Sequence, residues 1–313
     1  MSGRSASRDG YGKALLELSG RDDIVVLDAD LGKSTRSSWF REQFPGRSFS
    51  LGIAEQNMVS VAAGFASCGF TPLASTFAIF MERAFEQIRN SVVRPGLPVH
   101  FCGSHGGIHT GSDGSSAQSI EDLAIFRSLP LMAVMHPCDE RSAHALVIQS
   151  CDLDRPSYMR TTRNPSPILY GDDDRILLGE ANILRSGNHV AIMAIGVMVH
   201  RALQAAERLA RDGVHARVID VHTVAPLDLS TITRAARECG AIVTCEDHHV
   251  VGGLGSAVAE AVTASFPVPV MRVGVKGRFG ESGGSDELLD HLGLSVQAIV
   301  DAAHSAMNLR SGA

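Results

Sequence analysis

The stretch Gly52-Ile53-Ala54-Glu55-Gln56-Asn57-Met58 runs directly into Val59-Ser60-Val61-Ala62-Ala63-Gly64. A glycine-led turn followed by small apolar residues predicts a helix that packs closely against another backbone. Glu55 stands at the predicted start of this helix. Its carboxylate there either complements the helix dipole or works as an acid in a reaction, and position alone favours the dipole.

Around this helix, apolar runs of strand length alternate with segments of helical length. The strand Ile24-Val25-Val26-Leu27 precedes it, and further strands are predicted at 71–75, 98–102, 131–135 and 157–160. This alternation is typical of parallel β-α-β units whose sheet is covered on both faces. It predicts an α/β domain over residues 9–162, after a disordered lead at residues 1–8.

The pattern weakens over residues 163–187, where two prolines and the acidic run Asp172-Asp173-Asp174 predict a linker. The alternation then restarts, with apolar strands predicted at 190–195, 216–221, 241–245 and 268–273 and a closing helix at 295–306. These segments predict a second, smaller domain over residues 188–313. The predicted fold class is therefore α/β, with two parallel-sheet domains.

Composition argues against several functional classes. A net charge of -6 without a basic cluster argues against a nucleic-acid partner. No apolar run reaches the roughly 18 residues that would cross a bilayer, and the first residues form no signal-like apolar stretch. The six cysteines show no paired spacing, which favours reduced thiols and a cytoplasmic location.

The longest polar loop, Gly103 to Gln118, follows the strand predicted at 98–102. Ligands of parallel α/β sheets bind beyond the carboxyl ends of the strands. Five glycines in this loop suggest a backbone that approaches a ligand closely. His105 and His109 could be metal ligands, but the intervening Gly106-Gly107 argues against a helix that would align them, so no metal ligand is assigned.

Four arginines of the first domain could hold a phosphate group. Arg160 is the most suggestive of them because it ends a predicted strand, and a bidentate guanidinium suits phosphate. The others are Arg8, Arg83 and Arg163. Taken singly, each is more commonly a solvated surface charge.

Three motifs together resemble the thiamine-diphosphate-dependent transketolases. They are residues 52–58, the segment Ser75-Thr76-Phe77-Ala78-Ile79-Phe80-Met81-Glu82-Arg83-Ala84, and the loop from His105 to Asp113-Gly114. The likeness covers nearly the whole chain, including Glu246-Asp247-His248-His249 with Gly252-Gly253-Leu254-Gly255. It corresponds to the pyrimidine-binding and C-terminal domains, which make up the carboxyl-terminal half of a full-length transketolase.

The resemblance implies a cofactor-binding group built around Glu55. The matching glutamate hydrogen-bonds N1′ of the cofactor's aminopyrimidine and so switches on the intramolecular base that deprotonates the thiazolium. Phe80 matches the aromatic residue that stacks on the pyrimidine, and Phe77 lies nearby in sequence. Without the motif, both would be read as core residues. Arg83 stands at the same cofactor position, where many transketolases carry a tyrosine.

The resemblance also implies substrate contacts. His105 matches a histidine close to the donor's hydroxyl groups and is assigned a catalytic role, and Asp113 matches an aspartate that contacts a substrate hydroxyl. Arg8, Ser34 and Arg160 fall where transketolases hold the sugar phosphate. The C-terminal domain is expected to take no direct part in the chemistry.

Two residues depart from the family pattern. Ala117 stands where a histidine usually contacts the carbonyl region of the donor, and a methyl group can donate neither a proton nor a hydrogen bond. Arg83, within Arg83-Ala84-Phe85-Glu86-Gln87, resembles 1-deoxy-D-xylulose-5-phosphate synthase, which belongs to the same superfamily. The resemblance therefore leaves the substrate open.

No Gly-Asp-Gly motif, which marks the diphosphate-binding half of these enzymes, occurs in the sequence. Mg²⁺ needs oxygen ligands in an octahedral array, so its ligands are expected from another chain. We therefore expect a split transketolase, active only with an N-terminal diphosphate-binding partner in an α2β2 assembly. It would transfer a two-carbon ketol unit from a ketose, or ketose phosphate, to an aldose.

Two further functions remain open from the sequence. One is the β subunit of the decarboxylase component of a 2-oxo acid dehydrogenase, which shares this size and layout, or an enzyme similar to 1-deoxyxylulose-5-phosphate synthase. The other is a non-catalytic regulatory subunit that kept the fold. Ala117 favours the regulatory subunit, whereas intact Glu55, Phe80, His105 and Asp113 argue against it.

Overall fold

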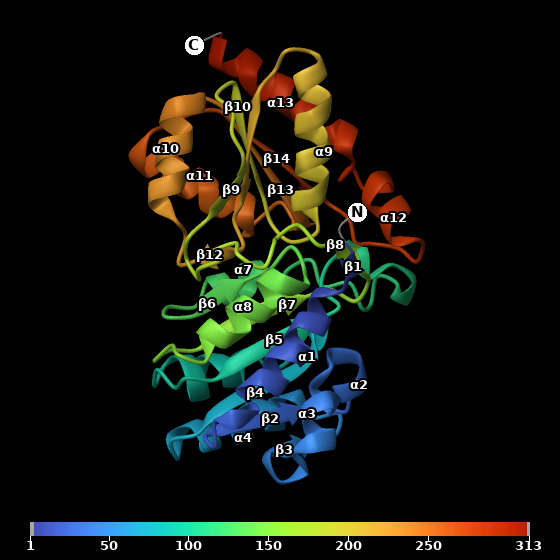
Figure 1. Ribbon diagram of the computed structural model, residues 1–313, viewed down its shortest axis with the longest axis vertical. Helices are drawn as coiled ribbons and strands as arrows, with labels where there is room; N and C mark the ends of the chain where they lie inside the picture. The colour runs from blue at the N-terminus through green and yellow to red at the C-terminus, as the bar shows by residue number, and fades with distance from the viewer. Residues whose placement is uncertain (1–2, 312–313) are drawn as a thin grey trace.

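Seven strands form the larger of the two main sheets in the computed structural model, which describes residues 3–311 (Figure 1). These strands are β2 (Ile24–Asp28), β3 (Ser48–Ser50), β4 (Thr71–Phe77), β5 (His100–Ser104), β6 (Ala133–Met135), β7 (Ser157–Thr161) and β12 (Thr223–Ala225). Their order is β12-β6-β7-β5-β4-β2-β3, and all pairs are parallel except β12 with β6. Strands β2, β5 and β7 are buried along their whole length, as expected of parallel strands covered on both faces.

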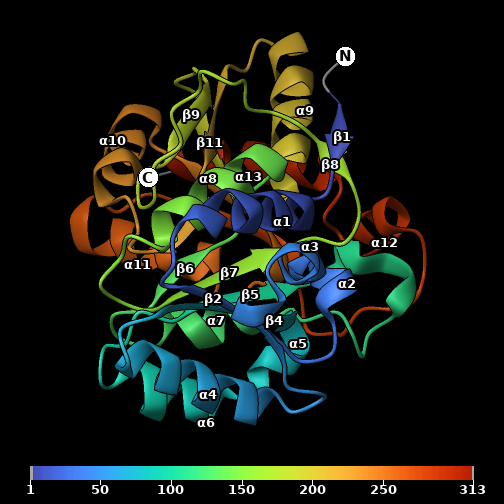
Figure 2. The same ribbon diagram turned by 60° about the horizontal axis from the view of Figure 1, so that its bottom comes forward.

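Helices cover both faces of this sheet, as Figure 2 shows. On one face α1 (Ser7–Glu17) packs against α8 (Glu140–Ser150) and α3 (Ser37–Gln43), with α2 (Gly32–Thr35) beside them. The other face carries α4 (Glu55–Ser67), α5 (Ala78–Glu82), α6 (Phe85–Gln87), the π-helical η3 (Ile88–Val93) and α7 (Asp122–Arg127). Short 3₁₀ segments are η1 (Leu18–Gly20), η2 (Pro45–Arg47) and η4 (Ile108–Asp113).

Five strands form the second sheet, in the order β14-β13-β10-β11-β9. They are β9 (Asn182–Arg185), β10 (Val190–Ala194), β11 (Ala216–Asp220), β13 (Ile242–His249) and β14 (Val270–Val275). Helices α9 (Met198–Arg211) and α13 (Val296–Ser311) lie on one face, and α10 (Leu229–Cys239) and α11 (Leu254–Ser265) on the other (Figure 1). Helix α12 (Ser285–His291) lies beside η4 of the first domain.

Local side chains set several helix ends. The carboxylate of Asp139 accepts from the backbone N–H of Ser142 at 2.8 Å, while the Ser142 hydroxyl contacts the Asp139 N–H, forming a capping box for α8. Asp228 caps α10 in a similar way, and Gly240 ends that helix with a φ of 67°. These capping residues set the ends of α8 and α10, and they can be recognised in the sequence.

The prediction of two α/β domains is confirmed, but two predicted boundaries differ, and neither sheet is wholly parallel. The lead predicted as disordered contains β1 (Arg4–Ser5), which pairs with β8 (Ser166–Pro167), and α1 already begins at Ser7; Met1 and Ser2 lie outside the described residues. The predicted linker 163–187 contains β8 and the whole of β9. Strands β9 and β12 are antiparallel, at the edges of otherwise parallel sheets.

The two domains are joined by more than a linker. Strand β12 follows β11 of the second domain in sequence, yet it pairs with β6 of the first sheet, and the N–H of His136 donates to the carbonyl of His222 at 2.9 Å. Buried side chains of both domains also belong to one continuous apolar cluster. Within residues 3–311, none of the helices has the length and apolar character needed to cross a membrane.

Candidate active site

The residues assigned to the cofactor come together at one edge of the first sheet. Glu55 begins α4 after a turn at Gly52, whose φ is 73°, and this turn follows β3. Phe77 ends β4, and His105 directly follows β5. Because β3, β4 and β5 are parallel members of one sheet, their carboxyl ends present these side chains to the same space.

The carboxylate of Glu55 is enclosed but sparsely bonded. The residue is only 1% exposed, and its Oε2 lies 3.5 Å from Nη1 of Arg83. The side chain of Arg83 is 59% exposed, and its carbonyl accepts from the Gln56 side chain at 3.4 Å. Glu55 thus stands at the positive end of a helix dipole, beside a cation that faces solvent.

Three flat groups lie nearly parallel at this edge. The rings of Phe77 and Phe80 are 5.5 Å apart with planes 10° from parallel, and those of Phe77 and His105 are 3.9 Å apart at 20°. Phe77 and Phe80 are partly exposed, so their rings are not closed off as core residues would be. The arrangement offers aromatic faces to a planar ring.

His105 is held tightly within its loop. Its backbone adopts a φ of 61°, its Nδ1 lies 2.8 Å from the Ser104 hydroxyl, and its carbonyl accepts from the Thr110 hydroxyl at 2.6 Å. Burial lowers the pKa of His105 to about 3, helped by the positive charges of Arg8 and Arg163. The imidazole is therefore neutral near pH 7, and such a ring can donate one hydrogen bond and accept another.

Cationic side chains gather beside His105. Arg8 donates to the Ser34 carbonyl at 3.0 Å, so these two predicted residues do meet. Arg163 lies 3.5 Å from the Asp113 carboxylate and donates to Ser112 at 3.1 Å. Burial, and then the positive charge of Arg36, lower the pKa of Arg8.

Arg160 corrects the sequence prediction. The side chain is fully buried, and its guanidinium donates to the Asp122 carboxylate, the Asp247 carbonyl at 2.6 Å and the Ser119 carbonyl at 3.2 Å. Burial alone would raise the pKa of Asp122, but Arg160 holds it at about 2. Arg160 has no exposed donor for a phosphate, so it is a structural residue.

Arg163 is the arginine beside His105 that the site assignment left out. Arg163 follows β7 by two positions, beyond the carboxyl end of the strand, whereas Arg160 lies inside it. The signal that could have found Arg163 is therefore the strand boundary. Arg36, also nearby, pairs with Asp9 at 2.7 Å and is not assigned to the site.

The glycines of the long loop serve a different purpose from the predicted one. A Cβ at Gly106 would meet the Arg160 side chain, and a Cβ at Gly107 would lie 2.2 Å from the Asp247 carboxylate. That carboxylate accepts from the backbone N–H groups of Ile108 at 2.7 Å and His109 at 2.9 Å. Gly106 thus allows the loop to pass the Arg160 side chain, and Gly107 allows it to lie against Asp247 of the second domain.

The site fits one end of thiamine diphosphate. Glu55 offers a carboxylate for a ring N–H, and the partly exposed Phe77 and Phe80 offer faces for an aminopyrimidine. Across residues 3–311, His, Cys, Asp and Glu side chains form no group of three or more that could hold a metal ion.

Two family models match the chain. The transketolase pyrimidine-binding domain matches residues 4–167, and the transketolase C-terminal domain matches residues 179–299. The chain is 43% identical over 299 residues to the 6-deoxy-6-sulfo-D-fructose transketolase subunit SqwH of Clostridium sp. (strain MSTE9), covering 95% of this chain and 93% of that protein. It is 39% identical over 302 residues to the transketolase of Mus musculus, covering 95% of this chain and 48% of that protein.

A solved structure agrees with these matches. The protein described as "Split gene transketolase, inactive beta4 tetramer" superposes with a TM-score of 0.91 at 45% identity, covering 97% of this chain and 99% of that one. These similarities support the transketolase prediction rather than the 2-oxo acid dehydrogenase, deoxyxylulose phosphate synthase or regulatory alternatives. The chain belongs to the transketolase family, whose pyrimidine-binding and C-terminal domains it contains.

Proposed function

We propose that this chain is one subunit of a split transketolase that moves a two-carbon ketol unit from a ketose to an aldose. The observation that carries the proposal is the convergence of Glu55, the parallel Phe77 and Phe80 rings and neutral His105 at one sheet edge. The transketolase family implies the use of thiamine diphosphate. When bound, this cofactor supplies a nucleophilic carbon that adds to the donor's carbonyl group.

Each residue of this edge has a role in that chemistry. Glu55 holds a proton at a ring nitrogen of the aminopyrimidine, while Phe80 and Phe77 fix the ring plane by stacking. Arg83 lies beside the Glu55 carboxylate and steadies its orientation. His105 donates or accepts a hydrogen bond at a donor hydroxyl, which a neutral imidazole at neutral pH can do in either direction.

The cationic groups beside His105 would bind the anionic end of the substrate. Arg8, with Ser34, and Arg163 would hold a terminal phosphate or sulfonate, and Asp113 would orient a hydroxyl group. The SqwH relative is named for a sulfonated fructose, so both anions belong in the first substrate screen. Because Ala117 can donate no hydrogen bond to the donor, Ala117→His should change the preference among donors.

The other half of the site would come from a partner chain. We propose that an N-terminal subunit binds the diphosphate through Mg²⁺ and that the two chains form an α2β2 assembly. The exposed surface beside Glu55 supports a partner at this position. Ile53 is 77% exposed, and the solvent-facing side of α4 carries the small or polar residues Gln56, Ser60 and Gly64. The free cysteines support a cytoplasmic location.

Reconstitution tests the proposal. The purified chain should transfer no ketol unit from fructose 6-phosphate or 6-deoxy-6-sulfofructose, and adding a partner with the Gly-Asp-Gly half should restore transfer from one of them. In the reconstituted enzyme, Glu55→Gln should lower kcat by at least about 100-fold, because it removes the proton-holding group. Glu86→Gln, at an exposed carboxylate in the same region, is the matched control.

Two results would contradict the proposal. Transfer by the chain alone would remove the need for a partner. Activity of Glu55→Gln equal to that of Glu86→Gln would remove Glu55 from the mechanism, provided that both variants bind the partner as tightly as the native chain in analytical ultracentrifugation.

A further inference from the structure

Gln118 is a buried polar side chain to which neither the cofactor nor the substrate assignment gives a role. It is only 2% exposed, and its amide nitrogen donates to two carbonyl oxygens, that of Gly111 at 3.1 Å and that of Glu281 at 2.9 Å. Because both partners are acceptors, the amide nitrogen and not the amide oxygen must face them. The two N–H groups of a single amide thus join the first domain to the second.

The first of these carbonyls belongs to the turn that carries Asp113. The carbonyl of Gly111 also accepts from the backbone N–H of Gly114 at 3.2 Å, which closes the turn around Asp113. Gly111 and Gly114 have φ values of 77° and 80°, in the left-handed region that favours glycine. Gln118 therefore restrains one end of the turn whose Asp113 carboxylate lies 3.5 Å from Arg163.

The second domain reaches this turn through the loop between β14 and α12. A Cβ at Gly280 of this loop would lie 1.8 Å from Oε1 of Gln118, so the loop is in direct contact with the amide. A Cβ at Gly114 would lie 2.6 Å from the Ser282 hydroxyl of the same loop. The turn and the loop are therefore packed too closely to accept a methyl group at either glycine.

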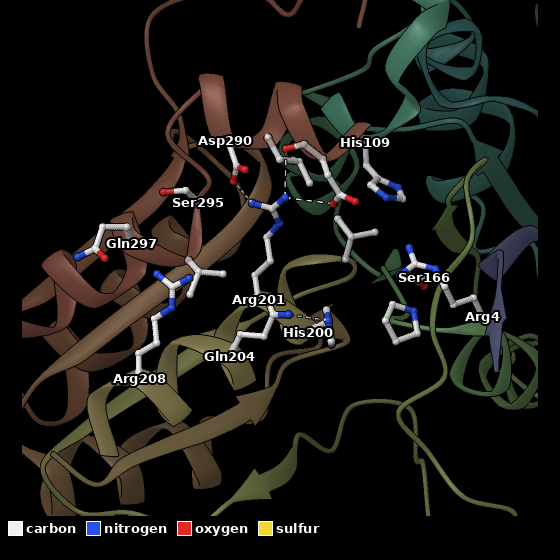
Figure 3. Close-up of a pocket in the computed structure, with 15 residues that line it drawn as sticks. Arg4, His109, Ser166, His200, Arg201, Gln204, Arg208, Asp290, Ser295 and Gln297 are labelled. Carbon is white, nitrogen blue, oxygen red and sulfur yellow. Dashed lines mark hydrogen bonds and ion pairs between the residues drawn. The ribbon is translucent and has the colours of Figure 1, made fainter. Parts of the chain in front are cut away.

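The loop is also tied to the rest of the second domain. Arg278 donates to the carbonyl of His291, at the end of α12, at 2.8 Å. Figure 3 shows Arg201 reaching from α9 to Asp290 of α12, and Arg201 also donates to the Asp286 carboxylate at 3.1 Å. The second acceptor of the amide thus belongs to a segment that is itself braced against α9.

We propose that Gln118 is a positioning residue, through which the second domain sets the place of Asp113 in the substrate site. This role rests on the proposed function, in which Asp113 orients a substrate hydroxyl group. A side chain that orients a substrate must be held within about 0.5 Å of its productive position by the hydrogen bonds around it. The second domain thereby acts on substrate binding, although none of its side chains is assigned to the site.

Hydrogen exchange of the purified chain tests the restraint without any turnover. Gln118→Leu removes both amide donors, and Gly280→Ala places a methyl group against Oε1 of Gln118 from the second domain. The backbone N–H groups of Gly114 and Ala117 are both hydrogen-bonded at the turn, and they should exchange at least about 10-fold faster in each variant. If Gln118→Leu fails to fold, Gln118→Asn, whose amide is one methylene group short, takes its place.

Kinetics of the reconstituted enzyme test the link to the substrate. Both variants should raise KM for fructose 6-phosphate about 10-fold and leave KM for hydroxypyruvate unchanged, because hydroxypyruvate has no hydroxyl group beyond the transferred two-carbon unit. Arg127→Gln is the matched control. It removes another hydrogen bond between the domains, from Arg127 to the Gly252 carbonyl at 3.0 Å, and should change neither the exchange at the turn nor either KM.

Unchanged exchange at Gly114 and Ala117 in both variants would overturn the proposal. Equal rises in KM for the two donors, or the same rises in Arg127→Gln, would also overturn it, since they would show a general loosening of the domains. If the native reconstituted enzyme turns over neither donor, the proposed function fails, whereas the exchange measurement still decides whether Gln118 holds the turn.

Discussion

Both domains place acidic and imidazole side chains at the carboxyl ends of parallel strands, and the candidate active site lies at the edge of the first domain's sheet. In the second domain, Glu246 accepts from the backbone N–H groups of Leu254 and Gly255 at 2.7 and 2.8 Å, which caps α11. Asp247 is likewise saturated by two backbone donors of the η4 loop. In the first domain, the Glu55 carboxylate has a single side-chain partner among residues 3–311, Arg83 at 3.5 Å.

Burial does not distinguish the two edges, because Glu55 and Asp247 are each only 1% exposed. The difference lies in how much of each group's hydrogen-bonding capacity its own chain satisfies. A carboxylate already bonded to two backbone donors cannot turn to a ligand without losing those bonds. Polar residues at strand ends therefore indicate a site only when the fold leaves them unsaturated.

The largest effect on stability is expected at Arg160, which bonds Asp122 in the first domain and the Asp247 carbonyl in the second. Arg160→Met leaves Asp122 as an unpaired charge in a fully buried position, which should lower the free energy of unfolding by about 3–5 kcal/mol. Arg163→Met, at the partly exposed arginine, should change it by less than about 0.5 kcal/mol. Urea unfolding of the purified chain measures both.

Equal losses of unfolding free energy in the two variants would contradict the difference in burial between Arg160 and Arg163. If Arg160→Met fails to fold, the double variant Arg160→Met, Asp122→Leu should recover much of the stability, since it replaces both charges of the pair.

A smaller effect is expected from Asp220, at the end of β11 in the second domain. Burial raises its pKa to about 7; its Oδ2 accepts from Tyr170 at 2.8 Å, and its Oδ1 accepts no hydrogen bond from any of residues 3–311. The ordinary value is 3.8, so between these two pKa values the folded chain holds a proton that the unfolded chain has lost. Stability should therefore fall as pH rises through this window.

The asparagine side chain of the Asp220→Asn variant cannot ionise. The stability of this variant should therefore not fall as pH rises through this window. Relative to the native chain, the variant should gain about 2 kcal/mol in the free energy of unfolding between about pH 5 and pH 7. Guanidinium unfolding at several pH values gives this difference, with Asp212→Asn, at an exposed carboxylate, as the control. Parallel pH profiles of the Asp220→Asn variant and the native chain would contradict the protonation of Asp220.

The smallest effect is expected at Arg163, in the candidate site of the first domain. In the reconstituted enzyme, Arg163→Gln should raise KM for an anionic donor about 10-fold while changing kcat little, because it removes one charged hydrogen bond from binding. Arg89→Gln, at an exposed arginine of η3, should change neither constant. An unchanged KM in Arg163→Gln would exclude this arginine from the substrate site.

The sequence could predict features that depend on local pattern. Alternating apolar strands and helices required two α/β domains, and the motif around Glu55 located the start of α4. Phe77, Phe80 and His105 were assigned through the resemblance to transketolases, and they meet because parallel strands bring their carboxyl ends together. Periodicity along the chain is a local property, which is why it is readable without a structure.

Only the tertiary structure decided which polar groups remain available. Arg160 and Arg163 lie three positions apart and look alike in sequence. However, every guanidinium nitrogen of Arg160 donates to Asp122, Asp247 or Ser119, which lie 38, 87 and 41 residues away. Likewise, β12 joins the first sheet although it belongs to the second half of the chain. Partners this distant in sequence leave no local pattern, so hydrogen-bond saturation, and with it the difference between a structural and a catalytic strand end, is determined only by folding.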